Sequence, residues 1–285
     1  MRANMDSGTL FVVATPIGNL ADLSARARST LEGVALIAAE DTRHTGAMLA
    51  TLGIDGRTTP LHEHNEERRV PELLERLRAG DDVALVSDAG TPLLADPGFR
   101  LVRAATEAGL PVRPIPGPCA VTAALSVSGL PTDRFRFEGF LPAKAAARRA
   151  RAAALARETV TLVLFEAPHR IAAMLTDLAA VFGGDRPVWV GRELTKQFEA
   201  HRRGSLDEVS ACFERGEEPA RGEFVVVVGG AGGEASADED AARDLLRALL
   251  DELPASRAAK VAARISGLTR SRLYELAMEM GDRSR

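Results

Sequence analysis

The sequence predicts an α/β protein with two compact units and a small helical appendage. In the first unit, short apolar runs alternate with amphipathic helical patterns, which is typical of βα repeats and of a parallel or mostly parallel sheet covered on both faces. Small, polar stretches punctuated by proline follow several of these runs. At 285 residues the chain also exceeds the size at which a single core usually suffices, so two units are expected.

The first unit is expected over residues 8–115. Its strand-like runs lie at 10–14, 34–38, 83–86 and 112–115, with helical patterns between them at 23–31, 66–78 and 99–108. The proline-rich stretch 114–118 then predicts a hinge.

The second unit is expected over residues 116–229. Strand-like runs lie at 134–140, 160–165, 188–190 and 224–228, and helical patterns at 120–127, 144–156, 170–181 and 207–213. Residues 229–240 are rich in glycine, alanine and acids and are predicted to be a linker. Three short helices are expected after it, forming an appendage over residues 241–282.

Composition excludes several classes of protein. With 46% hydrophobic and 27% charged residues the chain is expected to be globular, and its apolar runs are too short to span a bilayer. The first six residues lack the apolar segment of a signal peptide, so a cytoplasmic protein is expected. Cys119 and Cys212 are too far apart for a disulfide framework or a zinc site, and no histidine spacing indicates a metal.

The distribution of charge points to a polyanionic partner. The net charge of −4 argues against a dedicated nucleic-acid binder, which is usually basic. Two segments, 139–157 and 256–274, nevertheless contain several cations and no acid. Each could be only a solvated face, but the pair favours a polyanionic partner. The candidate contacts are Lys144, Arg148, Arg149, Arg151, Arg257, Lys260 and Arg270.

The most informative stretch is residues 87–98, which follows the strand at 83–86. A βα connection usually has about 2–6 residues, and this one is longer. Ligands of open α/β sheets bind outside the carboxyl ends of the strands, so this loop is expected to be functional. Asp96 is expected to cap the following helix, with Pro97 as its first residue.

Polar stretches follow other strands as well. Residues 14–24 contain Gly18, which allows a close backbone approach. Residues 39–45 are densely polar, and a helix cap at Asp41 or Thr42 leaves Glu40 and Arg43 unexplained. In the second unit, residues 165–170 and 192–199 have the same character.

Two common cofactor motifs are excluded. The segment 230–235 matches the dinucleotide fingerprint, but only helices are expected after it, and the fingerprint requires a second strand with an acidic residue. The chain contains no Walker lysine loop, and no serine or cysteine lies on a nucleophile elbow. Nicotinamide, P-loop and serine-hydrolase chemistry are therefore not expected.

At these polar stretches the chain resembles the small-subunit ribosomal RNA methyltransferase I family, a branch of the tetrapyrrole methylase superfamily. The first loop has less glycine than in the corrin and sirohaem enzymes, which separates the RNA branch from them. Residues 253–274 resemble the helix-turn-helix appendage of the same family. The stretches that carry the resemblance span residues 10–228 and are Ala14-Thr-Pro-Ile-Gly-Asn-Leu, Ala39-Glu-Asp-Thr-Arg-His-Thr, Ser87-Asp-Ala-Gly-Thr-Pro, Asp96-Pro-Gly, Pro116-Gly-Pro, Phe165-Glu-Ala-Pro-His-Arg, Glu193-Leu-Thr-Lys and Gly222-Glu-Phe.

The resemblance implies a tetrapyrrole-methylase-like fold of two α/β domains, a homodimer, and S-adenosylmethionine bound in the cleft between the domains. It also implies methylation of a cytidine ribose 2′-hydroxyl near the decoding centre of small-subunit ribosomal RNA. The positions that match cofactor contacts of the family, many of them through backbone atoms, are Pro16, Ile17, Asp88, Gly90, Thr91, Pro92, Ala120, Val121, Glu166 and Ala167.

The same reaction defines the catalytic candidates. A ribose hydroxyl is a poor nucleophile, so a general base, or a charge that stabilises the developing alkoxide, should help the transfer. Lys196 and Glu40 rank first because neither has an evident capping role. Interdomain salt bridges would explain these residues equally well. The full set of candidates is Glu40, Asp41, Arg43, His169, Glu193 and Lys196.

Two other functions remain open. A small-molecule tetrapyrrole methyltransferase would use the same fold and cofactor but leaves the basic clusters and the C-terminal helices without a role. A non-enzymatic nucleic-acid-binding regulator leaves the polar loops unexplained. A cofactor titration separates the regulator from both enzymes.

Overall fold

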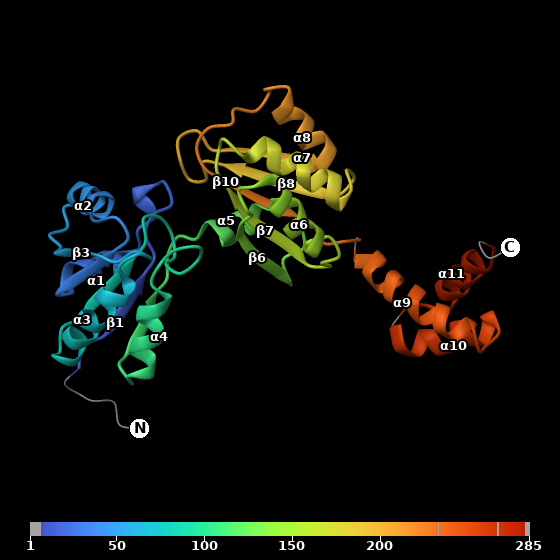
Figure 1. Ribbon diagram of the computed structural model, residues 1–285, viewed down its shortest axis with the longest axis horizontal. Helices are drawn as coiled ribbons and strands as arrows, with labels where there is room; N and C mark the ends of the chain where they lie inside the picture. The colour runs from blue at the N-terminus through green and yellow to red at the C-terminus, as the bar shows by residue number, and fades with distance from the viewer. Residues whose placement is uncertain (1–6, 233, 267, 283–285) are drawn as a thin grey trace.

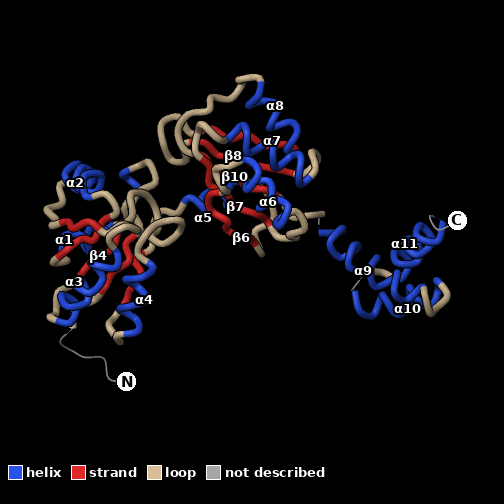
Figure 2. The backbone as a smooth tube through the Cα atoms, in the orientation of Figure 1, coloured by secondary structure: helices blue, strands red, loops and turns tan. Residues whose placement is uncertain are grey.

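The computed structural model describes residues 7–232, 234–266 and 268–282. It contains two α/β units followed by a group of helices, and Figure 1 shows the three parts in a row along the long axis of the molecule. The strands form two separate groups, and the C-terminal group is entirely helical (Figure 2). Both the α/β class and the helical appendage are as predicted.

The first sheet is parallel throughout, with the strand order β3-β2-β4-β1-β5. Helices α3 and α4 pack on one face and α1 and α2 on the other, each over its own apolar cluster. The predicted parallel sheet covered on both faces is therefore confirmed for this unit. Its elements are β1 (Leu10–Val13), α1 (Ala25–Gly33), β2 (Leu36–Ala39), α2 (Thr42–Thr51), β3 (Thr58–Pro60), α3 (Glu66–Arg78), β4 (Val83–Val86), α4 (Phe99–Glu107) and β5 (Val112–Ile115), with a 3₁₀ turn at Leu20–Asp22.

The sequence analysis gave no range for two elements of this unit, although it considered Asp41 as a helix cap. β3 is short and partly exposed, and it ends in Pro60, which a strand tolerates at the edge of a sheet. α2 is largely polar, so its apolar period is weak; Asp41 caps it by accepting a hydrogen bond from the Arg43 amide at 2.8 Å. By contrast, β4 is buried at every position, as expected of a central strand.

The second sheet is mixed, with the order β6-β7-β10-β8-β9. Only β6 and β7 are parallel, while β10 lies antiparallel between β7 and β8. Helices α6, α7 and α8 cover one face, and α5 covers the other. The elements are α5 (Ala120–Ser128), β6 (Phe135–Phe140), α6 (Ala145–Leu155), β7 (Thr161–Glu166), α7 (Ile171–Phe182), β8 (Pro187–Arg192), β9 (Ala200–Ser205), α8 (Leu206–Glu214) and β10 (Phe224–Val228).

β9 was not predicted because its sequence, Ala-His-Arg-Arg-Gly-Ser, has no apolar run. It pairs only with β8, so it is the edge of the sheet, where polar side chains are normal. The apolar cluster under α5 includes Ile17 from the first unit beside Val121 and Trp189 of the second. The two units are therefore in contact through this cluster.

The appendage consists of α9 (Glu234–Leu250), α10 (Ala255–Ser266) and α11 (Arg270–Asp282). These helices share a separate core that includes Leu246, Ala259 and Leu273. The prediction that residues 229–240 form a linker is wrong from Glu234 onward, because α9 already begins there. Alanine and glutamate are strong helix formers, and this preference decides the structure of an acid-rich segment. No helix of the described residues is long and apolar enough to cross a membrane.

Candidate functional site

The loops that follow β1 and β4 are joined at the carboxyl ends of these neighbouring strands. Thr15 and Gly90 exchange backbone hydrogen bonds of 2.8 and 3.0 Å, and the Thr15 hydroxyl donates to the Ser87 carbonyl oxygen at 3.2 Å. Gly90 has a φ of +87°, and a Cβ there would lie 3.2 Å from Cγ2 of Ile17. The backbone of Gly90 is thus packed closely against Ile17.

The long loop 87–98 carries backbone strain. Leu93 and Ala95 have φ angles of +75° and +69°, a conformation that costs a side-chain-bearing residue about 1–2 kcal/mol. The other non-glycine residues with positive φ in the described chain are Glu193 and Thr195, in the loop after β8. Such strain is often concentrated at functional sites.

The predicted capping role of Asp96 is wrong. The N-cap of α4 is Gly98, with a φ of +116°, and the helix begins at Phe99 rather than at Pro97. The carboxylate that serves this helix start comes from α3, because the Gly98 amide donates to Oε1 of Glu66 at 2.7 Å. A partner from another helix cannot be inferred from the local sequence. The Asp96 carboxylate is therefore available for another role.

A cavity of about 350 Å³ lies between the two units. Its walls include Ile17, Gly90 and Thr91 from the first unit, Ala120 and Val121 from the start of α5, and Glu166 and Ala167 from the end of β7. These are seven of the ten residues predicted to contact the cofactor.

The other three predicted cofactor residues lie beside this cavity. Pro16 and Asp88 line a second cavity, of about 380 Å³, which shares Ile17, Ala89 and Glu223 with the first. Pro92 is buried and lines neither. Sequence reasoning missed the apolar wall of the first cavity, because nothing local distinguishes its members from ordinary core residues. This wall includes Leu94, Phe140, Phe165, Leu194 and Val225.

The first cavity suits a nucleoside-sized ligand that carries hydrogen-bond donors. Its volume lies within the usual range of ligand sites, about 300–1,000 Å³. Oε1 of Glu166 accepts from the Ala167 amide at 2.8 Å and lies 3.1 Å from Nε of Arg170. Oε2 of Glu166 is buried without a hydrogen-bond partner. A buried polar atom on a cavity wall is normally satisfied, so a hydroxyl or amino group of a ligand would complete this site.

Lys196 links the two units. Its Nζ lies 2.9 Å from Oε1 of Glu193 and 3.0 Å from Oε2 of Glu223, and its side chain lines the second cavity. A Cβ at Gly18 would lie 2.3 Å from Cγ of Lys196, so the predicted close approach at Gly18 is confirmed. Burial alone would lower the pKa of Lys196, but the hydrogen bonds to both glutamates outweigh it and raise that pKa. The side chain is therefore an ammonium at neutral pH.

The residues predicted as catalytic candidates do not form one group. Lys196 and Glu193 are paired with each other. Glu40 belongs to an acidic group at the ends of β2 and β4, where its Oε2 accepts a long, 3.5 Å hydrogen bond from the Asp88 amide. Arg43 points to solvent, with 90% of its side chain exposed, and pairs with Asp41.

Two carboxyl groups of this acidic group, those of Glu40 and Asp96, have raised pKa values. Burial, followed by the charges of Asp96 and Asp88, raises the pKa of Glu40. Burial also raises the pKa of Asp96 to about 6; Asp88 adds to this shift and a hydrogen bond with Ser87 opposes it. Asp96 lines the first cavity, whereas Glu40 lines neither cavity.

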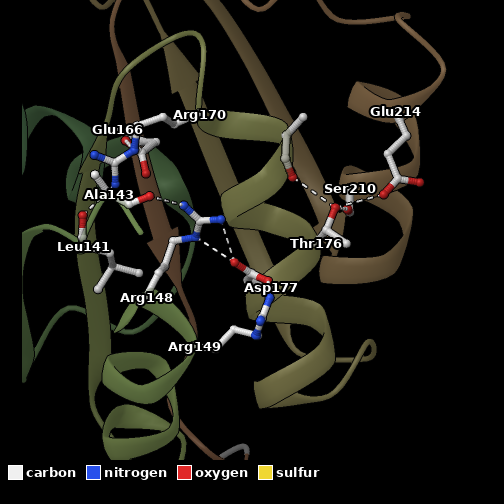
Figure 3. Close-up of polar contacts among 11 residues, drawn as sticks. Leu141, Ala143, Arg148, Arg149, Glu166, Arg170, Thr176, Asp177, Ser210 and Glu214 are labelled. Carbon is white, nitrogen blue, oxygen red and sulfur yellow. Dashed lines mark hydrogen bonds and ion pairs between the residues drawn. The ribbon is translucent and has the colours of Figure 1, made fainter. Parts of the chain in front are cut away.

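Three arginines of α6 pair with acids from other elements. Only 5% of Arg148 is exposed, and its Nε and NH2 both lie 2.7 Å from Oδ2 of Asp177 on α7. Arg149 reaches the other oxygen of Asp177 at 3.1 Å, and Arg151 pairs with Glu138 of β6. Figure 3 shows Arg148 between Asp177 and the Ala143 carbonyl oxygen. The position of Arg148 does not allow the predicted phosphate contact.

Four cations of the basic segment 256–274 in the appendage differ from those of α6. Arg257, Lys260, Arg264 and Arg270 are exposed, and no described carboxylate pairs with them. In the α6 segment, Lys144 is likewise exposed without a described carboxylate partner. Sequence alone made the two clusters look equivalent, and the fold distinguishes them.

Comparison with known families and proteins agrees with this architecture. The model of the tetrapyrrole (corrin/porphyrin) methylases matches residues 9–210, and that of the RsmI C-terminal HTH domain matches residues 236–281. A protein of Xylella fastidiosa named ribosomal RNA small subunit methyltransferase I is 53% identical over 94% of this chain and 98% of its own length. Proteins of the same name from Pseudomonas aeruginosa and Escherichia coli O157:H7 are 50% and 48% identical, over 98% and 97% of this chain and 100% and 97% of theirs.

Solved structures show the same fold. Diphthine synthase superposes with a TM-score of 0.58 at 18% identity, covering 78% of this chain and 90% of that one. The uroporphyrin-III C-methyltransferase of Thermus thermophilus, solved in complex with S-adenosylhomocysteine, has a TM-score of 0.54 at 21% identity, covering 78% and 97%. The family models and the full-length relatives together show that the chain belongs to the tetrapyrrole methylase family, in the branch of the small-subunit ribosomal RNA methyltransferases I.

Proposed function

We propose that the protein is an S-adenosylmethionine-dependent methyltransferase that modifies a cytidine ribose 2′-hydroxyl in small-subunit ribosomal RNA, near the decoding centre. The observation that carries this proposal is the cavity between the units, which gathers seven of the ten residues matched to cofactor contacts. The names of the full-length relatives support ribosomal RNA as the substrate. The neighbour solved with S-adenosylhomocysteine supports the cofactor class.

The cavity offers suitable groups for S-adenosylmethionine. Backbone atoms of Gly90, Thr91 and Ala120 can hold polar edges, the apolar wall can hold the adenine ring, and Oε2 of Glu166 can accept from a hydroxyl or an amino group. When bound, this cofactor supplies a methyl group that its sulfonium has already activated, so we propose no metal.

Lys196 is proposed to act on the acceptor. Its ammonium carries a positive charge at neutral pH and lines the second cavity, so it can stabilise negative charge that develops on a ribose oxygen. Glu193 and Glu223 hold that ammonium in place. Fixed positioning of the reacting groups can itself lower the barrier by several kcal/mol.

The appendage is proposed to supply most of the RNA-binding surface. Its free cations Arg257, Lys260 and Arg270 are available to phosphates, and Lys144 can add a further contact. Arg149 and Arg151 are proposed to contribute less to RNA binding because each is already paired with a carboxylate. Arg148 is not proposed as an RNA contact because it is buried and paired with Asp177. A homodimer is proposed from the family resemblance, and a cytoplasmic location from the ribosomal substrate.

The decisive experiment is transfer of a labelled methyl group from S-adenosylmethionine to unmodified small ribosomal subunits, followed by mass mapping of the RNA. The expected product carries one methyl group on a cytidine ribose. A methyl group on a base, or preferential labelling of a tetrapyrrole offered in competition, would contradict the proposal. Failure of the folded protein to bind the cofactor in calorimetry would favour the non-enzymatic regulator.

A further inference from the structure

The cavity between the units contains a carboxylate that the proposed function has not used. Resting on that function, we infer that Asp96 is the general base that takes the proton of the ribose hydroxyl during methyl transfer. Asp96 lines the first cavity, in which the cofactor is proposed to bind, and this cavity shares Ile17, Ala89 and Glu223 with the second cavity, beside which the acceptor is proposed to lie.

The local structure keeps this side chain available. Glu66 of α3 accepts the hydrogen bond from the Gly98 amide, so Asp96 is not needed to cap α4. Among the described residues, Asp96 has no ion pair, and its side-chain hydrogen bond is with the Ser87 hydroxyl. The flanking φ angles of +75° at Leu93 and +69° at Ala95 show that the chain adopts a costly conformation around it.

The other carboxylate and hydroxyl side chains that line the first cavity already have partners or a proposed role. Oε1 of Glu166 pairs with Arg170 and accepts from the Ala167 amide, and Oε2 is proposed to accept from the cofactor. Glu223 is exposed and paired with Lys196, which as an ammonium cannot accept a proton. The Thr91 hydroxyl donates to the Pro118 carbonyl oxygen at 3.0 Å.

The groups around Asp96 favour proton acceptance near neutral pH. Desolvation raises its pKa to about 6, Asp88 adds a like charge, and the Ser87 hydroxyl partly offsets both. The charges of Glu40 and Asp96 also interact, and the charge of Glu63 acts on Glu40. Above pH 6 the side chain is a carboxylate with more basicity than an ordinary aspartate, which suits a general base.

The proposed step transfers one methyl group to the ribose oxygen and one proton to Asp96. The ribose oxygen forms a bond to the methyl carbon while the carbon–sulfur bond breaks, and the electron pair of the broken bond stays on sulfur. The hydroxyl proton passes to the Asp96 carboxylate and is later released to solvent. S-adenosylhomocysteine leaves as a neutral thioether.

The test is the isosteric variant Asp96→Asn, assayed in single turnovers on unmodified small subunits. We expect methyl transfer to slow by about 10²–10⁴-fold, while calorimetric affinity for S-adenosylhomocysteine changes by less than about threefold. The wild-type rate should rise tenfold per pH unit below about pH 6 and level off above it. That pH dependence should be absent from Asp96→Asn.

Two further measurements separate a catalytic role from a structural one. A ¹³C NMR titration of the aspartate carboxyl groups in the ligand-free protein should contain one resonance with a pKa near 6, and Asp96→Asn should lack it. Asp96→Glu, which restores a carboxylate, should recover part of the rate. The matched control is Asp133→Asn, at a carboxylate that is 68% exposed and lines neither of the two cavities, and it should keep the full rate.

The outcomes are distinguishable. Full single-turnover activity of Asp96→Asn would overturn the inference alone. A loss of cofactor affinity as large as the loss of rate would also overturn it, because Asp96 would then be a cofactor ligand. If the wild-type protein transfers no methyl group to the subunits, the proposed function fails and the inference fails with it.

Discussion

At the residue scale, two glycines show how the site depends on close backbone contact. Gly90 holds a left-handed conformation against Ile17, and Gly18 leaves room for the stem of Lys196 from the other unit. A side chain at either position would occupy space that belongs to the cleft. Each glycine therefore contributes to the site because it has no Cβ, which allows the close contact with Ile17 or Lys196.

Gly90→Val is expected to weaken S-adenosylmethionine binding by about tenfold or more, because a branched residue at positive φ costs about 1–2 kcal/mol and its Cβ would press on Ile17. Calorimetry measures the affinity. Gly109→Val is the matched control, since Gly109 also has a positive φ, +70°, but its Cβ would meet no atom within 4 Å. Equal affinity losses in the two variants would show that strain, and not the cavity, is responsible.

Lys196→Met is expected to slow single-turnover methyl transfer by about a hundredfold, because it removes the ammonium and keeps an aliphatic stem beside Gly18. Cofactor affinity should stay within about threefold.

Glu40→Gln should likewise reduce methyl transfer more than cofactor binding, because the charge of Glu40 interacts with those of Asp88 and Asp96. Full rates in both variants would make these residues structural.

At the element scale, α6 and α7 illustrate how a basic helix becomes part of a core. Asp177 on α7 accepts from both Arg148 and Arg149, and Arg148 also donates to the Ala143 carbonyl oxygen at 3.3 Å. The pair Arg148–Asp177 is mostly buried, with 6% and 11% of the side chains exposed. A buried ion pair is costly to break because the remaining charge is left without its partner.

Arg148→Met is therefore expected to lower the free energy of unfolding by about 3–5 kcal/mol, while RNA affinity of the folded protein stays unchanged. Arg149→Met should cost only about 0–1 kcal/mol, because Arg149 is 53% exposed and shares Asp177 with Arg148. Urea unfolding of both variants measures the difference. A stable Arg148→Met protein with weakened RNA binding would restore Arg148 to the RNA surface.

At the scale of the whole molecule, the appendage is a separable part. Its helices have a core of their own, and the chain reaches it through the short Gly229–Gly232 segment after β10. Truncation after Gly232 should abolish most RNA binding and leave cofactor affinity intact. A cut at Ala241 would divide α9 and is the poorer design. Loss of cofactor binding in the truncated protein would show that the parts are coupled.

The salt dependence of RNA binding tests which cluster contacts phosphate. Replacing Arg257, Lys260 and Arg270 by alanine should reduce the slope of log affinity against log salt by about 2–3, at roughly 0.7–0.9 per contact. Replacing Arg149 and Arg151, which are already paired with carboxylates, should change the slope by less than one contact. Filter binding over a salt series supplies the slopes. A larger effect from the α6 pair would reverse the assignment.

The sequence by itself determined the elements whose signals are local. The apolar run at 83–86 and the amphipathic pattern at 66–78 coincide with β4 and α3. Both signals depend only on the hydrophobicity of residues that are close together in the sequence. The polar stretches after the strands also revealed the family and most of the cavity lining, since their residue types are visible without a fold.

Only the tertiary structure decided how remote groups pair. The edge strands β3 and β9 exist because a neighbouring strand supplies their hydrogen bonds, which their own polar sequences do not indicate. Asp177 lies 29 residues from Arg148, and Glu66 lies 32 residues from the Gly98 amide that it caps. The first contact removes Arg148 from the predicted RNA-binding surface, and the second shows that Asp96 does not cap α4. Charge compensation and burial depend on what lies nearby in space, and local sequence does not contain that information.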